Sequence, residues 1–67
     1  MEEFAKRLKD LRKEKELSQA ELAKALFIDQ SSVTKYETCK ATPSVEMLIK
    51  FAEYFKVSTD YLLGLED

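Results

Sequence analysis

The chain has 67 residues, of which 45% are hydrophobic and 36% are charged, and it contains one glycine, one proline and one cysteine. This length suits one small domain, and the composition excludes a disordered segment, a collagen-like repeat and a turn-rich β-barrel. No apolar run is long enough to span a membrane, and the first residues do not resemble a signal peptide. We therefore expect a single helical domain over residues 1–67, located in the cytoplasm.

Few residues could carry enzymatic chemistry. The chain has no histidine, and its lone cysteine, Cys39, can form neither an internal disulfide nor a zinc site. A single glycine cannot build a phosphate-binding loop. We therefore expect no catalytic residue, no metal and no cofactor, and we interpret the many carboxylates as solvated helix faces.

Apolar spacing and caps predict the first three helices. Phe4, Leu8 and Leu11 recur at i, i+4 and i+7 and predict a helix over about residues 2–15. The sequence Ser18-Gln-Ala-Glu21 is a capping box, in which side chains and backbone N–H groups pair reciprocally, so a second helix should follow it. Three of that helix's residues should face inward: Leu22, Ala23 and Leu26. Asp29 can cap a third helix that runs to about Glu37, with Val33 and Tyr36 on its buried side.

Two further helices are expected after Thr42-Pro43, because proline disfavours helix at the residue before it. Ser44 should cap a fourth helix. Its core-facing stripe is expected to contain Val45, Leu48, Ile49, Ala52 and Phe55. A short last helix over Thr59–Leu63 should end at Gly64, where a C-terminal cap favours glycine.

The helices Gln19–Leu26 and Gln30–Glu37, joined by a tight turn, fit a helix-turn-helix over about residues 18–37. That motif needs a small residue at the helix crossing and apolar residues in the turn and in the second helix, and Ala23, Ile28 and Val33 meet these needs. Three longer segments resemble the lambda-repressor-like, Cro/Xre-type helix-turn-helix regulators of bacteria and phages: RLKDLRKEKELSQAELAKAL, SSVTKYE and TPSVEMLIKFAEYFKVSTDYLLG. The resemblance covers nearly the whole chain and implies an all-α, compact five-helix bundle.

The resemblance also implies roles for individual residues in binding double-stranded DNA. Arg12 and Glu37 match a partly buried ion pair between the first and third helices. The residues that match base-reading positions are Gln30, Ser31, Thr34 and Lys35. The residues that match backbone-contacting positions are Gln19, Ser32, Tyr36, Thr38 and Lys40. The chemistry fits: an amide pairs with adenine, lysine donates to guanine, and a threonine methyl group can touch a thymine methyl group.

Some of these residues also have simpler interpretations, as solvated or core residues without a role in DNA binding. Gln30, Ser31 and Thr34 would be ordinary solvated residues without the resemblance, and Tyr36 is expected to serve mostly the core. The basic residues of the first helix are better explained as a solubilising surface with i,i+4 partners than as a second DNA site.

The chain departs from the family pattern at three turns. Relatives usually carry glycine where this chain has Glu16, Phe27 and Cys39. A non-glycine residue in left-handed backbone costs on the order of 1 kcal/mol. We therefore expect either a positive φ at Phe27 or a reshaped turn. Cys39 is interpreted as a small replacement for glycine rather than as a redox switch.

One recognition helix reads only about four to six base pairs, so relatives bind palindromic operators as symmetric dimers. The candidate homodimer interface comprises Met47, Phe51, Tyr54, Tyr61 and Leu65. We thus expect a dimeric, sequence-specific regulator, a repressor that occludes a promoter. Two alternatives remain open. One is an antitoxin-like autorepressor with a protein partner. The other is a protein-interaction module without DNA binding, which the sequence pI of 5.1 favours.

Overall fold

The computed structural model describes residues 2–66, and their regular secondary structure is entirely helical. The five helices are α1 (Glu2–Glu14), α2 (Gln19–Leu26), α3 (Gln30–Glu37), α4 (Val45–Phe55) and α5 (Thr59–Leu62). The predicted all-α, five-helix fold is therefore confirmed, and α1 and α5 each end one residue earlier than expected. None of these helices combines the length and the apolar character needed to cross a membrane.

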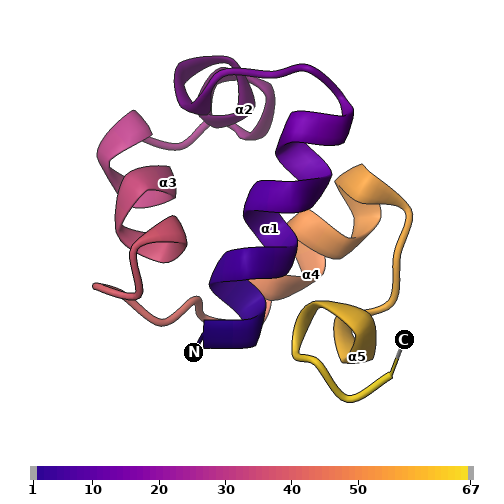
Figure 1. Ribbon diagram of the computed structural model, residues 1–67. Helices are drawn as coiled ribbons and strands as arrows, with labels where there is room; N and C mark the ends of the chain where they lie inside the picture. The colour runs from indigo at the N-terminus through magenta and orange to yellow at the C-terminus, as the bar shows by residue number, and fades with distance from the viewer. Residues whose placement is uncertain (1, 67) are drawn as a thin grey trace.

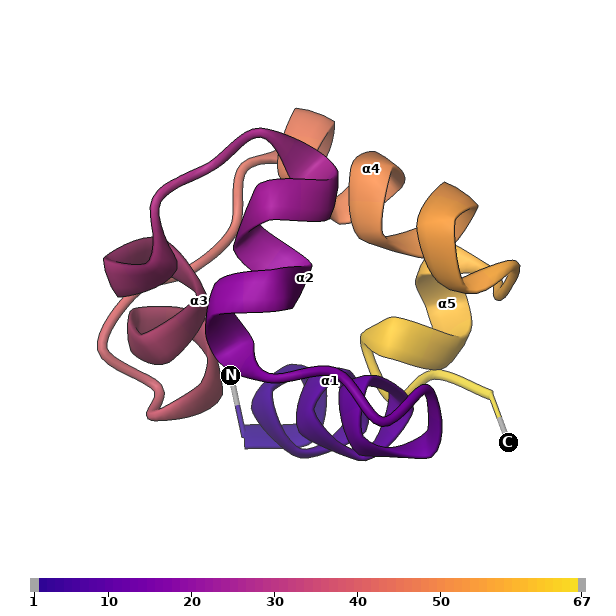
Figure 2. The same cartoon turned by 90° about the horizontal axis from the view of Figure 1, so that it is seen from above.

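The helix α1 lies across the middle of the molecule in Figure 1, with α2 and α3 towards one side and α4 and α5 towards the other. Seen from above in Figure 2, α2 and α3 pack next to each other, and α1 runs along the base of both halves. Contacts of α1 with α3 and with α5 join the two halves, and the whole measures 27 × 23 × 19 Å. The core lies between them and contains Phe4, Leu8, Leu22, Val33, Phe51 and Leu62, which are almost fully buried.

Serine side chains cap three of the helices. Ser18, Ser44 and Ser58 each accept a hydrogen bond from the backbone N–H three residues later. At α2 the capping box is complete, because the Ser18 N–H also donates to the Glu21 carboxylate at 2.8 Å. The predicted side-chain cap at Asp29 is wrong: its carboxylate makes no cap hydrogen bond. Only its backbone acts as a cap, and its carbonyl accepts from the Ser32 N–H at 3.0 Å.

All five helices end with the same backbone motif. In each, one residue just after the helix has a positive φ, and the next N–H reaches back to a carbonyl five residues earlier, as in a Schellman cap. The positive-φ residues are Glu16, Phe27, Cys39, Lys56 and Gly64. The expectation at Phe27 is confirmed, with φ 58°. The turns therefore keep left-handed geometry although four of the five residues are not glycine.

The core-facing side of α4 differs from the expected stripe. Leu48, Ala52 and Phe55 face inward as predicted, but the predicted core residues Val45 and Ile49 are 74% and 44% exposed. Phe51 is fully buried instead. The reason is the helical spacing: residues 48, 51, 52 and 55 share the side directly opposite the charged residues 46, 50 and 53.

The burial of Phe51 ties α4 to α1 and α3 through a cluster of aromatic rings. Its ring centroid lies 5.9 Å from that of Phe4 and 5.7 Å from that of Tyr36. The rings of Phe4 and Tyr36 also meet edge to face at 6.1 Å. Tyr36 thus serves the core, as the sequence suggested, although it belongs to the helix that carries the candidate site.

The short helix α5 is held against α1 by Arg7, a residue that no sequence pattern marks. Its guanidinium donates to the backbone carbonyls of Tyr61 at 3.0 Å and Glu66 at 2.7 Å, and it lies 4.4 Å from the centre of the Tyr61 ring. Gly64, with φ 78°, allows close approach here, because a Cβ atom at this position would lie 2.8 Å from Glu3. Arg7 therefore closes the end of the bundle.

Candidate nucleic-acid interface

The end of α3 is fixed to α1 by a buried ion pair. Arg12 donates to the two carboxylate oxygens of Glu37 at 2.7 Å from Nε and 3.0 Å from Nη2. Nη1 of Arg12 donates to the Leu17 carbonyl at 2.7 Å. Arg12 and Glu37 are both buried, and the hydrogen bond to Glu37 raises the pKa of Arg12 above its ordinary value. The ion pair implied by the resemblance is thus present in the structure, where it sets the position of α3.

Gln19 extends this ion pair across α2 to the middle of α3. Its Nε2 donates to Oε1 of Glu37 at 3.0 Å, and its Oε1 accepts from the Thr34 hydroxyl at 2.6 Å. The resemblance implied only a contact between Gln19 and the DNA backbone, and neither of these two bonds follows from the sequence. Arg12, Glu37, Gln19 and Thr34 form one continuous chain of hydrogen bonds, which we call the polar chain.

The outward side of α3 carries the predicted base-reading residues. Gln30, Ser31 and Lys35 are exposed, while Thr34 is half-buried beside Gln19. On the opposite side of the helix, Val33 and Glu37 are buried. The helix therefore offers an amide, hydroxyl groups and an ammonium group on a firmly anchored backbone, the kind of surface that can meet base edges.

The predicted backbone-contacting residues lie around the rim of this surface. Thr38 and Lys40 are exposed, and Ser32 and Tyr36 are half-buried. The Thr38 hydroxyl donates to the Thr34 carbonyl at 2.7 Å, so its own oxygen lone pairs remain available. Ser32 and Tyr36 belong to α3, Thr38 and Lys40 follow its C-terminal end, and Gln19 at the start of α2 lies beside α3 through its bond to Thr34.

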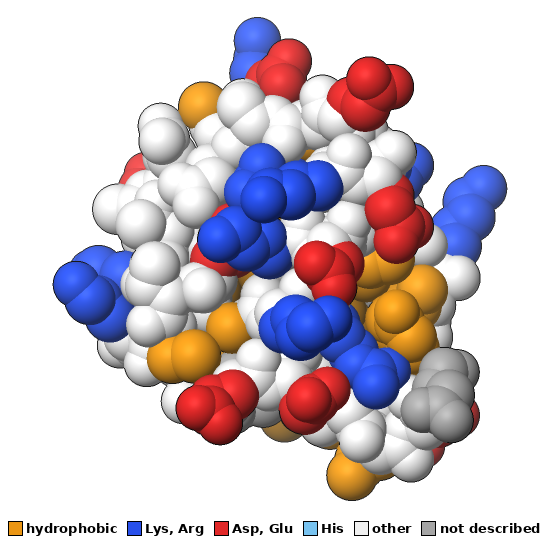
Figure 3. All heavy atoms as spheres, in the orientation of Figure 1, with side chains coloured by type: hydrophobic (Ala, Val, Ile, Leu, Met, Phe, Trp, Pro, Cys, Tyr) orange, Lys and Arg blue, Asp and Glu red, His pale blue; other side chains and the backbone are white. Residues whose placement is uncertain are grey.

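The charges on α1 do not form a second cationic surface. Figure 3 shows Lys and Arg side chains on the face that carries α1, interleaved with Asp and Glu. Lys6 pairs with Asp10 at 2.9 Å and Arg7 pairs with Glu3 at 3.2 Å, both at i,i+4 spacing. Lys6 and Arg7 thus have acidic partners on the same helix. Around α3, by contrast, Lys35 and Lys40 are exposed and the Glu37 carboxylate is neutralised by Arg12.

The predicted dimer residues do not form one exposed surface. Phe51 cannot be a contact residue as predicted, because its side chain is fully buried among aromatic rings. Met47, Tyr54 and Tyr61 are half-buried against the core, and of the five only Leu65 is largely exposed. The apolar residues that α4 actually exposes are Val45 and Ile49, one turn apart.

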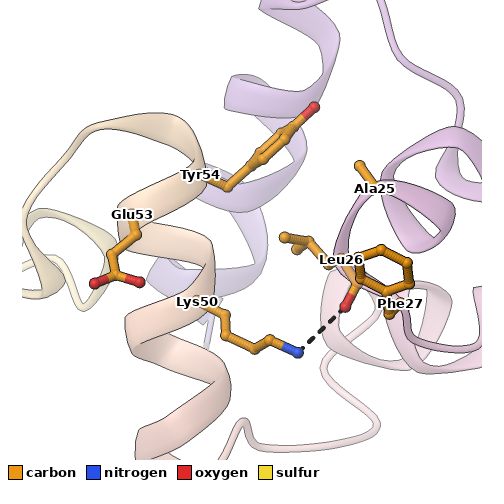
Figure 4. Close-up of a pocket in the computed structure, with 6 residues that line it drawn as sticks. All are labelled: Ala25, Leu26, Phe27, Lys50, Glu53 and Tyr54. Carbon is orange, nitrogen blue, oxygen red and sulfur yellow. Dashed lines mark hydrogen bonds between the residues drawn. The ribbon is translucent and has the colours of Figure 1, made fainter.

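A shallow pocket of about 360 Å³ lies between the end of α2 and the second half of α4. Figure 4 shows the Lys50 side chain of α4 extending towards the Leu26 carbonyl, while the Tyr54 ring points away from Phe27. The Lys50 ammonium donates to the Leu26 carbonyl at 3.2 Å and so supplies a further cap for α2. The Phe27 side chain is 93% exposed beside this pocket. Because Gln19 and Phe27 stand at opposite ends of α2, the pocket lies away from the polar chain.

A family model described as helix-turn-helix (HTH_3) matches residues 8–62, a segment that contains the polar chain and both helices of the motif. The chain belongs to the Cro/Xre-type helix-turn-helix family. Family membership confirms the resemblance seen in the sequence.

Named relatives of the chain are longer proteins. It is 35% identical over 65 residues to the HTH-type transcriptional activator BcrR of Enterococcus faecalis, which covers 97% of this chain and 32% of BcrR. It is 37% identical over 64 residues to the HTH-type transcriptional regulator ImmR of Bacillus subtilis (strain 168), covering 96% of this chain and 50% of ImmR. It is 36% identical over 58 residues to the cryptic phage CTXphi transcriptional repressor RstR of Vibrio cholerae, covering 87% of this chain and 52% of RstR. The chain thus spans about a third to a half of the length of these relatives.

Proposed function

We propose that the chain binds double-stranded DNA in a sequence-specific manner and acts as a transcriptional regulator, with α3 in the major groove. One observation carries this proposal. Gln30, Ser31 and Lys35 are exposed on one side of α3, while the other side is anchored by Val33 and by the Arg12–Glu37 ion pair. An α-helix fits the major groove of B-DNA, and these polar groups match base edges there. The family to which the chain belongs supports the same function.

Contacts with the sugar–phosphate backbone would surround this helix. The exposed Lys40 and the Thr38 hydroxyl lie at its C-terminal end. Ser32 and Tyr36 are half-buried on α3 and would reach the backbone only with their polar tips. The Gln19 amide nitrogen keeps one N–H for a phosphate after donating to Glu37, and it stands at the start of α2, where the helix dipole favours an anion.

We propose further that two copies bind together to a palindromic operator, because a single reading helix covers too few base pairs for specificity in a genome. Val45 and Ile49 supply the apolar residues that α4 exposes, and we assign the contact between copies to them. The relatives bear the names of both an activator and a repressor. For this chain we propose repression by occluding a promoter, which requires no contact with the transcription machinery.

Selection of binding sites from a randomised DNA pool, repeated over a range of salt concentrations, tests the proposal. A dimer contacting some six to eight phosphates should show a log–log slope of affinity against salt near −5 to −7, as an approximate value. Lys35→Ala should relax the preference at one base pair of each half-site, whereas Lys40→Ala should weaken all sequences alike. If no sequence is enriched, the DNA-binding proposal is wrong and a protein-interaction module takes its place.

Sedimentation with and without the selected DNA tests the contact between copies. Ile49→Glu should disrupt association, because it places a carboxylate on the exposed apolar residues of α4. Glu53→Gln, a change of an exposed residue on the charged side of the same helix, is the matched control and should leave association unchanged. A wild-type chain that binds DNA as a single copy would contradict the dimer.

A further inference from the structure

The Thr34 hydroxyl lies on the reading helix and has one proton to donate. Two acceptors lie within reach of that proton. Oε1 of Gln19 is 2.6 Å from the Thr34 hydroxyl oxygen, and the Gln30 carbonyl oxygen is 3.3 Å from it. The contact with Gln30 is longer than the usual O–H···O hydrogen bond of about 2.5–3.0 Å, so Gln19 is the main acceptor of the Thr34 proton.

The direction of the Gln19–Thr34 bond follows from the far end of the polar chain. The carboxylate of Glu37 accepts two hydrogen bonds from Arg12 and has no proton of its own to give. The end of the Gln19 amide that faces Glu37 must therefore be its NH₂ group, which donates at 3.0 Å. The amide oxygen is left facing Thr34. Thr34 must then be the donor, and the ion pair determines the orientation of an amide that would otherwise be free to flip.

The surface of α3 is changed by this arrangement. A free threonine hydroxyl rotates and can either donate to a base or accept from one. Here the proton is directed inward to Gln19, so the Thr34 oxygen offers only lone pairs to a ligand. In the major groove the hydrogen-bond donors of the base edges are the exocyclic amines, N6 of adenine and N4 of cytosine.

We propose that Gln19 is a positioning residue that makes Thr34 an acceptor-only reader, so that each half-site carries an exocyclic amine of adenine or cytosine opposite Thr34. This inference rests on the proposed function. It replaces the expected contact between the Thr34 methyl group and a thymine methyl group, and it gives Gln19 a part in specificity beyond any phosphate contact.

Base analogues in the selected site test the inference. Each adenine is replaced in turn by purine, which lacks N6, and by 7-deazaadenine, which lacks N7. Each cytosine is replaced by 2-pyrimidinone, which lacks N4, and each thymine by uracil, which lacks the methyl group. With the wild-type chain, loss of one amine per half-site should weaken binding about three- to tenfold, the worth of one hydrogen bond.

Three variants assign that effect to the hydroxyl and to its orientation. Thr34→Ser keeps the hydroxyl and should keep the effect of removing the amine. Thr34→Val keeps the branched shape and the methyl group and should abolish it. Gln19→Met keeps the length of the side chain but leaves the Thr34 proton only its long contact with the Gln30 carbonyl. The hydroxyl can then turn and donate to a base, so the difference in affinity between sites with an amine and sites with a carbonyl group at this base pair should become smaller. A loss of stability alone would weaken all sequences alike and would not move this discrimination.

The outcomes separate the inference from the function on which it rests. If the wild-type chain selects a site but Thr34→Val retains the amine effect, or if only the uracil substitution matters, the inference is wrong and the DNA-binding function stands. An unchanged discrimination in a folded Gln19→Met variant overturns the positioning role of Gln19. If no site is selected at all, the proposed function and the inference fail together.

Discussion

Arg12 and Glu37 hold each other by two hydrogen bonds between α1 and the end of α3, and both side chains are buried. A buried pair of this kind brings little net stability compared with apolar residues of the same size, but loss of one partner leaves an uncompensated charge in the core. The pair therefore fixes where α3 stands, and the Gln19 amide takes its orientation from it.

Glu37→Leu should reduce the free energy of unfolding by about 3–5 kcal/mol, because the Arg12 guanidinium would remain buried without its carboxylate. For a domain of this size, with a total stability of about 5 kcal/mol, such a loss leaves much of the chain unfolded. Urea denaturation followed by circular dichroism measures the change. The double variant Arg12→Met, Glu37→Leu removes both charges and should be clearly more stable than Glu37→Leu alone. Equal stability of the two variants would contradict this account.

Phe27→Gly should raise the free energy of unfolding by about 0.5–1 kcal/mol. Phe27 has φ 58° and its side chain is 93% exposed, so glycine removes backbone strain and little packing. Thermal unfolding should show an increase in the midpoint of a few degrees. Lys24→Gly, one turn earlier inside α2, is the control and should lower the midpoint, because glycine weakens a helix interior. A lower midpoint for Phe27→Gly would show that its ring contributes packing.

Arg7→Met should loosen α5 by about 1–2 kcal/mol, since it removes the two hydrogen bonds to the carbonyls of Tyr61 and Glu66. Amide hydrogen exchange of residues 59–65 measures this loosening, and it should accelerate there more than in α2. Lys6→Met is the matched control, because Lys6 makes only an exposed i,i+4 pair with Asp10 and its loss should change little. Exchange that accelerates equally in all helices would mean that Arg7 stabilises the whole bundle rather than its end.

Acid should weaken the start of α2. The hydrogen bond from the Ser18 backbone N–H lowers the pKa of Glu21 below its ordinary value of 4.5. A carboxylate with a lowered pKa in the folded state contributes stability above 4.5, and this contribution is lost as the pH falls through the lowered pKa. Stability measured against pH should therefore fall below about 4.5 more steeply in the wild type than in Glu21→Gln. An NMR titration of Glu21 that gives an unshifted pKa would contradict the cap.

Sequence patterns predicted the fold well because caps and spacing act locally. Ser18, Ser44 and Ser58 begin three helices as side-chain caps. In α4 the apolar spacing alone was misleading, because apolar residues surround most of the helix. The three charged residues Glu46, Lys50 and Glu53 share one side, and the opposite side of the helix contains Phe51, which is buried. The polar stripe was therefore the better guide to the core.

The candidate site was predictable only in part. The pairing of Arg12 with Glu37 and the polar outward side of α3 follow from residues that match a family pattern. The bond between Gln19 and Thr34 joins two residues that are 15 positions apart in the chain and lie on different helices. No local pattern reveals that contact, because it depends on how α2 crosses α3. The clamp of Arg7 on the carbonyls of the last helix likewise depends on packing, since carbonyl groups carry no sequence signal.

The place of Tyr36 between the rings of Phe4 and Phe51 has a consequence for recognition. The helix α3 cannot shift without opening the aromatic cluster, so the backbone that meets a ligand is preorganised before the encounter. The conformational entropy lost on binding then comes mainly from long exposed side chains such as Gln30 and Lys35, because the main chain is already ordered. Differences in affinity between DNA sequences should accordingly come from their dissociation rates more than from their association rates.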